Sequence, residues 1–334
     1  MDQKLRIFAY SLRSDEVDYF KSFSAANGIG LATCAEAPSL STIGLSAGYP
    51  CVSIITTIIT SEMVKAFYDA GVRFISTRTI GYDHIDLIAA HKIGMRVGNA
   101  PYSPDSVADY TIMLMLMATR RMKAILRKSA AQDFSLSGAQ GVELHNLTVG
   151  IAGTGRIGRK IIRKLSGFGC EILAYDLYES EELRGIATYV PWKELCRRSD
   201  LISLHMPATQ DNFHIVGRDS LANMKDGVFI VNTARGNLID TQAFLDAVES
   251  GKVGGAALDV IEDEADLYYN DLRGVPLKTR DLALLKSYPN VLVTPHTAFY
   301  TDQAVRDMVE NSLRSCIAFQ RGEDNPWEVR LNPR

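Results

Sequence analysis

Residues 148–158 read Thr-Val-Gly-Ile-Ala-Gly-Thr-Gly-Arg-Ile-Gly, and this stretch is the most informative part of the sequence. Its opening residues are mostly apolar, as in a buried strand, and an amphipathic helical pattern follows them. Gly153 permits a tight turn, Gly155 lets a pyrophosphate approach the backbone, and Gly158 lets the helix pack close to the strand. The helix N-terminus offers free N–H groups to the phosphates. The stretch predicts a dinucleotide site, and a glycine turn without a ligand is the alternative.

A carboxylate follows at the distance that a dinucleotide site uses. Asp176 ends the next apolar run, 18 residues beyond Gly158. An acid at this place accepts hydrogen bonds from the adenosine ribose hydroxyls and repels a 2′-phosphate. We therefore expect NAD rather than NADP as the cofactor, and a plain strand-end acid is the alternative.

Short apolar runs alternate with helical stretches on both sides of residue 148, which predicts parallel sheets in an α/β protein. In the first part, strands are expected at 6–10, 52–55, 73–76 and 95–98. In the second part, they are expected at 148–152, 171–175, 201–205, 228–231, 256–260 and 291–294. These six are the number that a full dinucleotide-binding sheet requires. The length of 334 residues favours two domains.

Four helices have clear sequence patterns. The pattern Ser103-Pro104-Asp105 predicts the start of a long helix that continues to about Arg127. The other three are expected at 156–165, 241–250 and 301–321.

Composition narrows the class of protein. The net charge of −3 argues against a nucleic-acid partner, which normally requires a basic surface. The five cysteines are scattered, contain no CxxC and offer no metal-ligand spacing, so free thiols in a reducing cytoplasm are expected. The start MDQKLRIFAY is no signal peptide. The uncharged run 110–119 is far shorter than the ~20 residues that cross a membrane, so a soluble protein is expected.

Three polar residues follow expected strands at their carboxyl ends, the ligand-binding side of such sheets. They are Arg235, Glu264 and His296. Singly, each has a structural alternative: a loop cap, a solvated acidic turn and a structural histidine. Together with the glycine motif, a cation, an acid and an imidazole are what hydride transfer to a keto acid requires.

Over nearly its whole length the chain resembles the D-isomer-specific 2-hydroxyacid dehydrogenases. The matching stretches, besides 148–158, are STRTIGYDHID (76–86), YSPDSVADYT (102–111), MKDGVFIVNTARGNLIDT (224–241), GGAALDVIEDE (254–264) and NVLVTPHTAFYT (290–301). Within the family the chain is most similar to D-lactate dehydrogenases, including those of vancomycin-resistance clusters. It is also similar to dehydrogenases of branched-chain and aromatic 2-oxo acids.

The resemblance implies two Rossmann-like or flavodoxin-like α/β domains with an active-site cleft between them. The outer, substrate-binding domain would be discontinuous and comprise residues 1–101 and 300–334, with an NAD-binding domain at 102–299. The helix after Tyr102 would contribute to the interface of a homodimer.

The resemblance also implies roles for individual residues. Arg235 binds the substrate carboxylate and keto oxygen, His296 is the proton donor, and Glu264 is its acidic partner. The backbone N–H groups of Ile80 and Gly81 hold the carboxylate. Two tyrosines, Tyr102 and Tyr300, complete the expected substrate site. The expected cofactor-binding residues are Gly153, Gly155, Arg156, Ile157, Gly158, Asp176, His205, Met206, Pro207, Thr233, Ala234 and Asp259.

The expected reaction is reduction of pyruvate to D-lactate with NADH. The segment 99–104 is one residue shorter than the commoner family pattern Asn-Val-Pro-X-Tyr-Ser-Pro, which affects how Tyr102 reaches the substrate. Aromatic residues at 82, 299 and 300 would narrow the pocket or stack on a ring, so phenylpyruvate, indolepyruvate and 2-oxoisocaproate are alternative substrates. A phosphorylated substrate would require more cations near 79–83. A non-enzymatic, NAD-responsive corepressor is the distant alternative, disfavoured because no long disordered tail is expected.

Overall fold

The computed structural model describes residues 5–264, 267, 270–277 and 279–330. The chain forms two compact units, Met1–Ser103 with Tyr300–Arg334, and Pro104–Phe299. We call them unit 1 and unit 2, and each is described by itself. Residues 1–4 and 331–334, which begin and end the expected outer domain and include the start of MDQKLRIFAY, lie outside the described residues.

Unit 1 is built on a five-stranded parallel sheet in the order β2-β1-β3-β4-β5. Its strands are β1 (Arg6–Ala9), β2 (Gly30–Thr33), β3 (Cys51–Ile54), β4 (Phe74–Thr77) and β5 (Arg96–Gly98). Its helices are α1 (Val17–Asn27), η1 (Ile43–Ser46), α2 (Ser61–Asp69), α3 (Leu87–Lys92) and α11 (Asp302–Arg321). Numbered within the unit, the order 2-1-3-4-5 is that of flavodoxin-like folds.

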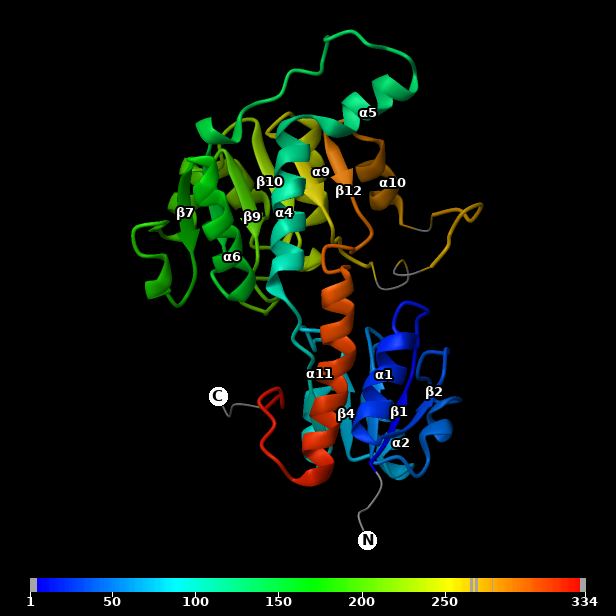
Figure 1. Ribbon diagram of the computed structural model, residues 1–334. Coiled ribbons are helices and arrows are strands. Elements are labelled where there is room, and N and C mark those ends of the chain that lie inside the picture. The colour runs from blue at the N-terminus through cyan, green and yellow to red at the C-terminus, as the bar shows by residue number, and fades with distance from the viewer. Residues whose placement is uncertain (1–4, 265–266, 268–269, 278, 331–334) are drawn as a thin grey trace. The chain divides into compact units, whose positions relative to one another are not determined.

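The last helix completes unit 1. The side chain of Thr301 caps α11 by accepting a hydrogen bond from the N–H of Ala304. The buried stripe of α11, which includes Val309 and Leu313, packs with α1 on one face of the sheet, whereas α2 and α3 cover the other face. Figure 1 shows α11, from the end of the chain, beside α1 from its beginning. The sheet face thus requires two segments that are far apart in sequence.

Unit 2 contains a seven-stranded parallel sheet in the order β12-β11-β10-β9-β6-β7-β8. Its strands are β6 (Thr148–Ala152), β7 (Glu171–Tyr175), β8 (Thr188–Tyr189), β9 (Leu201–Leu204), β10 (Val228–Asn232), β11 (Val253–Leu258) and β12 (Val291–Val293). Its α-helices are α4 (Pro104–Thr119), α5 (Met122–Ala130), α6 (Arg156–Leu165), α7 (Trp192–Arg198), α8 (Arg218–Asn223), α9 (Thr241–Glu249) and α10 (Arg280–Ser287). Its 3-10 helices are η2 (Leu144–Asn146), η3 (Ser166–Phe168), η4 (Glu181–Leu183) and η5 (Gly236–Leu238).

Helices cover both faces of the unit 2 sheet. One core packs α4 and α6 on one face, where Figure 1 shows them side by side. The other core joins α7, α8, α9 and α10 to the opposite face. Counted within the unit, the strands run 3-2-1-4-5-6-7, so the order reverses between β6 and β9. This doubly wound arrangement confirms the predicted α/β class and places a ligand crevice at the carboxyl ends of the strands.

Strand β11 begins at Val253, three residues before its predicted start, and three differences from the sequence-based predictions concern whole elements. The sheet has a seventh strand, β8, which is only two residues long, and unit 1 has the additional strand β2. The long helix begins at Pro104 as predicted but ends at Thr119, and Arg121 adopts a left-handed conformation (φ 53°) before α5 begins. No residue of α5 is buried. The helix therefore ends where the apolar core ends, and a prediction of one helix to Arg127 was wrong.

The bend after α4 brings two cations to the end of another helix. Lys123 donates to the carbonyls of Lys286, Tyr288 and Val291 at 2.9, 2.6 and 2.5 Å. Arg127 donates to the carbonyls of Lys286 and Ser287 at 3.2 and 3.5 Å. The carbonyls of residues 286–288 lie at the C-terminus of α10, which has no further helical turn to satisfy them, whereas Val291 begins β12. Within the described residues, no helix is long and apolar enough to cross a bilayer.

Candidate active site

Six strands of unit 2 end level with one another. The last residues of neighbouring strands are paired with one another across the sheet. In the order β7, β6, β9, β10, β11, β12 these residues are Tyr175, Ala152, Leu204, Asn232, Leu258 and Val293. The residue that follows each of these positions is therefore at the same edge of the sheet. With strands about 4.8 Å apart, this edge is roughly 24 Å long. All residues predicted to bind the cofactor lie on it or within six residues of it.

The glycine motif forms the middle of this edge. Gly153 has a left-handed backbone (φ 98°), and a Cβ there would lie 2.6 Å from the carbonyl of His205. A Cβ at Gly158 would lie 1.9 Å from the carbonyl oxygen of Gly153, so α6 packs directly on the turn. A Cβ at Gly155, in contrast, would meet no protein atom within 4 Å. Protein packing thus explains the first and third glycines, whereas the second leaves open space beside the N-terminus of α6, where a pyrophosphate fits.

Asp176 lies immediately after β7, beside this turn. Its Oδ2 accepts hydrogen bonds from the backbone N–H and hydroxyl of Thr154 at 2.5 and 3.0 Å, and its Oδ1 accepts from the N–H of Tyr178 at 3.1 Å. These bonds fix the carboxylate against the glycine loop without using all its lone pairs. The residue keeps partial exposure and can still accept ribose hydroxyls. The glycine turn and the acid together fit a dinucleotide without a 2′-phosphate.

The next two strand ends supply five further predicted cofactor residues, and Asp259 follows β11. His205 follows β9, and its Nε2 lies 2.8 Å from the hydroxyl of Ser203. Although the residue keeps some exposure, the protein packed around its ring lowers the pKa of His205 to about 3, so the imidazole is neutral at physiological pH. Met206 and Pro207 continue this loop. After β10, the hydroxyl of Thr233 lies 2.9 Å from that of Thr111 on α4, and Ala234 follows.

A buried amide shapes the loop that carries Arg235. Asn232 is fully buried at the end of β10. Its Nδ2 donates to the carbonyl of Arg235 at 2.8 Å, and its Oδ1 accepts from the N–H of Ala234 at 3.0 Å. The guanidinium of Arg235 donates to the carbonyl of Ala234 at 2.8 Å. The Asn232 side chain therefore sets the turn on which the predicted substrate cation stands.

Glu264 and His296 meet beyond β11 and β12. Oε1 of Glu264 lies 3.5 Å from Nδ1 of His296, and Oε2 accepts a hydrogen bond from the N–H of Ile261 at 2.8 Å. Both side chains are largely but not fully buried, at 16 % and 27 % exposure. With Nδ1 facing the carboxylate, Nε2 is the ring nitrogen on the side away from Glu264. The pair has the geometry of an acid that orients an imidazole.

The side chain and backbone of Asp259 bind the loop that carries His296. It is 2 % exposed, and its carboxylate accepts hydrogen bonds from the hydroxyl of Thr294 (2.6 Å) and the N–H groups of Thr297 (3.0 Å) and Ala298 (2.9 Å). Its carbonyl accepts from the N–H of His296 at 2.9 Å. His296 itself is in the left-handed region (φ 51°), a strained conformation for a side chain of its size. These contacts give Asp259 a structural task, and its predicted proximity to the nicotinamide remains a prediction.

In unit 1, the predicted carboxylate-binding loop follows β4. The carbonyls of Thr79, Ile80 and Gly81 accept hydrogen bonds from the N–H of Ala100 (3.0 Å), Nδ2 of Asn99 (2.8 Å) and the hydroxyl of Thr79 (2.6 Å). Within the described residues, no protein acceptor takes a hydrogen bond from the N–H groups of Ile80 and Gly81. A loop whose carbonyls are bound inward and whose successive N–H groups are available is suited to an anion.

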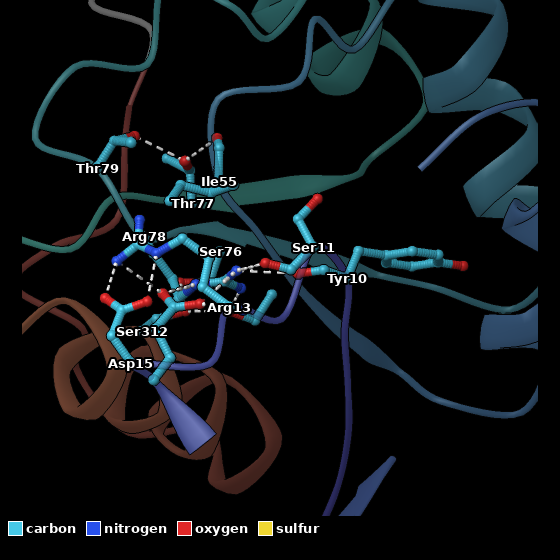
Figure 2. Close-up of polar contacts among 12 residues, drawn as sticks. Tyr10, Ser11, Arg13, Asp15, Ile55, Ser76, Thr77, Arg78, Thr79 and Ser312 are labelled. Atoms are coloured by element: carbon cyan, nitrogen blue, oxygen red, sulfur yellow. Dashed lines mark hydrogen bonds and ion pairs between the residues drawn. The ribbon is translucent and has the colours of Figure 1, made fainter. Parts of the chain in front are cut away.

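A buried ion pair supports this loop. Arg78, fully buried, donates from Nε to Oε1 of the equally buried Glu16 at 2.9 Å, and to the carbonyls of Tyr10 and Ser11 at 2.9 and 3.1 Å. Burial lowers the pKa of Arg78, and Glu16 opposes that effect. Figure 2 shows Arg78 with Tyr10 and Ser11, and also the hydroxyl of Thr77, which donates to the carbonyl of Ile55 at 2.9 Å.

The remaining predicted substrate residues also belong to unit 1. Tyr102 precedes α4, and Tyr300 is 52 % exposed with the Arg13 guanidinium 5.8 Å from its ring centroid. Arg235, Glu264 and His296 therefore share unit 2, whereas Ile80, Gly81, Tyr102 and Tyr300 share unit 1. Sequence reasoning missed Asn232 and Thr79 as supports of the two loops. Their short polar side chains next to predicted site residues were the available signal.

Comparison with known proteins identifies the family of this chain. Residues 112–298 match the family model of the D-isomer specific 2-hydroxyacid dehydrogenase, NAD binding domain. A D-specific alpha-keto acid dehydrogenase of Enterococcus faecium is 43 % identical over 96 % of this chain and 98 % of its own. An aromatic 2-oxoacid reductase of Clostridium sporogenes is 42 % identical over 95 % and 96 %. The crystal structure of a D-lactate dehydrogenase from Treponema pallidum matches with a TM-score of 0.87 and 35 % identity, over 98 % of this chain and all of that one. The chain belongs to the D-isomer-specific 2-hydroxyacid dehydrogenases and is an NAD-dependent oxidoreductase that acts on a CH–OH group.

Proposed function

We propose that this enzyme reduces a 2-oxo acid to the D-2-hydroxy acid, with pyruvate and D-lactate as the first pair to test. The observation that carries the proposal is the arrangement after β10, β11 and β12. There a guanidinium, a carboxylate and an imidazole follow three neighbouring strand ends, on the edge that also carries the glycine motif. Such an edge presents a cation, an acid and a proton donor to one ligand.

NADH, when bound along this edge, supplies the hydride that C2 of the substrate receives. His296 donates a proton from Nε2 to the oxygen on which negative charge develops. A positioned general acid contributes about 10²–10⁴-fold to such a step. Glu264, on the Nδ1 side, favours the protonated ring before the transfer. The Arg235 guanidinium binds the substrate carboxylate and stabilises the charge on the keto oxygen.

We further propose that the loop of Ile80 and Gly81 in unit 1 binds the substrate carboxylate through its backbone N–H groups. Two successive backbone N–H groups match the two oxygens of such an anion, and they keep their direction because the loop carbonyls are bound elsewhere. Tyr102 and Tyr300 would border the group at C3. This assignment gives unit 1 the task of recognising the acid and unit 2 the task of reducing it.

The test is a substrate panel. NADH oxidation is followed by absorbance with pyruvate, 2-oxoisocaproate, phenylpyruvate and indolepyruvate. We expect turnover with at least one of them, and His296→Gln should abolish most turnover while NADH binding stays within about twofold. If the wild-type protein binds NADH yet reduces none of the four acids, the proposed function is wrong, and the corepressor-like alternative gains support.

An aromatic or branched 2-oxo acid is the second candidate. It is supported by the 42 % identity to an aromatic 2-oxoacid reductase, which exceeds the 36 % identity to a D-lactate dehydrogenase of Lactiplantibacillus plantarum. Tyr82 and Tyr300 are 40 % and 52 % exposed and offer rings for stacking, whereas Phe299 is buried at 6 % exposure, contrary to the expectation from sequence. A kcat/KM for phenylpyruvate above that for pyruvate would favour this candidate.

We also infer a cytoplasmic homodimer. Support comes from large apolar side chains exposed on α4, α5 and the segment after them: Met113, Leu126, Phe134, Leu136 and Val142. Exposed apolar area of this kind typically marks a protein interface. The free thiols of all five cysteines fit a reducing compartment. Sedimentation or light scattering of the purified protein measures the oligomeric state directly.

A further inference from the structure

We propose that His214 is a positioning residue that ties the loop carrying Arg235 to the loop carrying Glu264. The proposal rests on the proposed function, because it assigns His214 a role in keeping those two side chains in register. It concerns a histidine outside the predicted catalytic set, on the segment between β9 and α8.

The backbone of His214 is bound to the Arg235 loop. Its N–H donates to the carbonyl of Asn237 at 2.9 Å. Two residues later, Val216 donates to Leu238 and accepts from Asp240, both at 3.0 Å, so the segment runs as a short parallel bridge beside the residues that follow Arg235. A movement of His214 therefore moves the loop of the substrate cation.

The ring of His214 is bound to the Glu264 loop. Its Nε2 lies 2.6 Å from Oε1 of Glu262, two residues before Glu264. The other oxygen, Oε2, accepts hydrogen bonds from the N–H and hydroxyl of Thr241 at 3.0 and 2.5 Å. Glu262 is thereby held between the imidazole and the N-terminus of α9. A charge-assisted bond of this length is among the stronger side-chain contacts in proteins.

The two loops also touch each other at the point that the His214 ring secures. A Cβ at Gly236, the residue after Arg235, would lie 2.1 Å from the carbonyl of Ile261. The N–H of the same Ile261 donates to Oε2 of Glu264 at 2.8 Å. A loosened Glu262 would let Ile261 move away from Gly236 and would change the direction of the Glu264 carboxylate.

Backbone conformation is consistent with a constrained junction. His214 and Asp263 both adopt left-handed conformations (φ 54° each), as His296 does. Such residues persist where surrounding contacts determine them, and they cluster at active sites. The His214 ring is further restrained by stacking on Phe213, with ring centroids 3.8 Å apart.

The charged groups around His214 come from several elements. Oδ2 of Asp240, the N-cap of α9, lies 3.9 Å from Nδ1, and Glu262 faces Nε2. A groove of about 570 Å³ beside the ring is also lined by Lys193 of α7 and by Arg218 and Asp219 of α8. The side chain is 29 % exposed, so solvent reaches the junction.

The test compares His214→Phe, which keeps a ring but removes the donor, with His214→Gln, which keeps an N–H donor. His91→Phe, on the exposed side of α3, is the control. For His214→Phe we expect kcat to fall about tenfold, the effect of one lost charge-assisted hydrogen bond, with NADH affinity within about twofold. In the pH dependence of kcat for reduction of the 2-oxo acid, the alkaline limb should move to lower pH, because the Glu264–His296 contact weakens. His214→Gln should restore most of the rate.

The proposal is overturned if folded His214→Phe keeps the wild-type rate and pH profile. It is also overturned if His214→Phe lowers the melting temperature without moving the pH profile of reduction and His214→Gln does not restore the rate. Those results would mean that His214 has a structural role alone. If His214→Phe does not fold, Thr241→Val probes the same anchor and should lower kcat about two- to threefold, and an unchanged rate counts against the proposal. If the wild-type protein reduces no acid, the proposed function has failed separately. In that case the test is hydrogen exchange of the backbone amides in residues 237–241 and 259–264. We expect faster exchange in His214→Phe than in the wild type, and equal exchange would contradict the proposed link between the two loops.

Discussion

Replacing Thr79 with valine tests whether the loop of Ile80 and Gly81 is aimed by its carbonyl contacts. The substitution keeps the β-branched shape and removes the hydroxyl that donates to the Gly81 carbonyl at 2.6 Å. Without that bond, the peptide between Gly81 and Tyr82 can rotate about the Gly81 Cα. This loosens the loop next to the Gly81 N–H, although the peptides that carry the N–H groups of Ile80 and Gly81 are not freed directly. The contacts to Ile80 and to the Thr79 carbonyl remain, so the loop is loosened rather than unfolded.

Valine also removes the contact of the Thr79 hydroxyl with that of Thr77 at 2.7 Å, but the Thr77 hydroxyl keeps its bond to the Ile55 carbonyl. The expected magnitude therefore follows from the one neutral hydrogen bond to the Gly81 carbonyl, about 0.5–1.5 kcal/mol, which corresponds to roughly 2- to 13-fold in an equilibrium constant. The carboxylate is unchanged during the reaction, so its contacts are equal in ground state and transition state. We therefore expect KM for the 2-oxo acid, and the Kd of the unreactive analogue oxamate, to rise by this factor with little change in kcat. Steady-state kinetics and NADH-fluorescence titration with oxamate measure both.

Thr79→Ser is the matched control because it keeps the hydroxyl. The reasoning is refuted if valine leaves KM and oxamate affinity unchanged, or if serine causes the same loss as valine. A fall in kcat without a change in KM would likewise contradict a role in binding the carboxylate.

Three further predictions address other parts of the enzyme. Glu264→Gln removes the carboxylate 3.5 Å from Nδ1 of His296, so in the pH dependence of kcat for reduction the alkaline limb should move to lower pH. Asp176→Ala should weaken NADH relative to NADPH by at least about tenfold, measured as the ratio of their KM values, because the acceptor for the ribose hydroxyls is lost. Glu16→Gln leaves the buried guanidinium of Arg78 without a counter-charge and should lower the free energy of unfolding by about 3–5 kcal/mol, measured by urea denaturation.

Each of these predictions has a clear contrary result. An unmoved pH profile in an active Glu264→Gln enzyme would remove that acid from the mechanism. An unchanged cofactor ratio would show that Asp176 is a turn residue. For the ion pair, Lys65→Gln is the control, since Lys65 and Asp69 are 72 % and 60 % exposed and such a pair contributes only about 0.3–0.5 kcal/mol. Equal effects of the exposed and buried changes would contradict the argument from burial.

The elements that local sequence patterns determine were predicted best. Helix α6 has the predicted bounds, 156–165, because a glycine turn begins it and a regular apolar stripe continues to Leu165. The strands that were predicted are apolar runs buried on both faces of a parallel sheet. Arg235, Glu264 and His296 could be singled out because residues after such strands share one edge, whatever their separation in sequence.

Features that depend on distant partners escaped prediction. Strand β8 is two residues long and exists because β7 offers an edge to pair with. The end of α4 is set by where its apolar neighbours end, and α5 by carbonyls more than 150 residues later. The roles of Asn232, Thr79 and His214 likewise depend on hydrogen bonds to loops whose positions only the folded chain defines.

The place of α11 in unit 1 has a consequence for how the protein is made. The ribosome synthesises β1 to β5 first, yet one face of their sheet is covered by a helix that begins at Asp302. Unit 2 contains no residue after Phe299, so all of its residues are available once Phe299 has left the ribosome. The strands of residues 1–103 therefore remain incompletely covered while unit 2 is translated, so we expect this amino-terminal third to expose apolar surface until α11 has been synthesised.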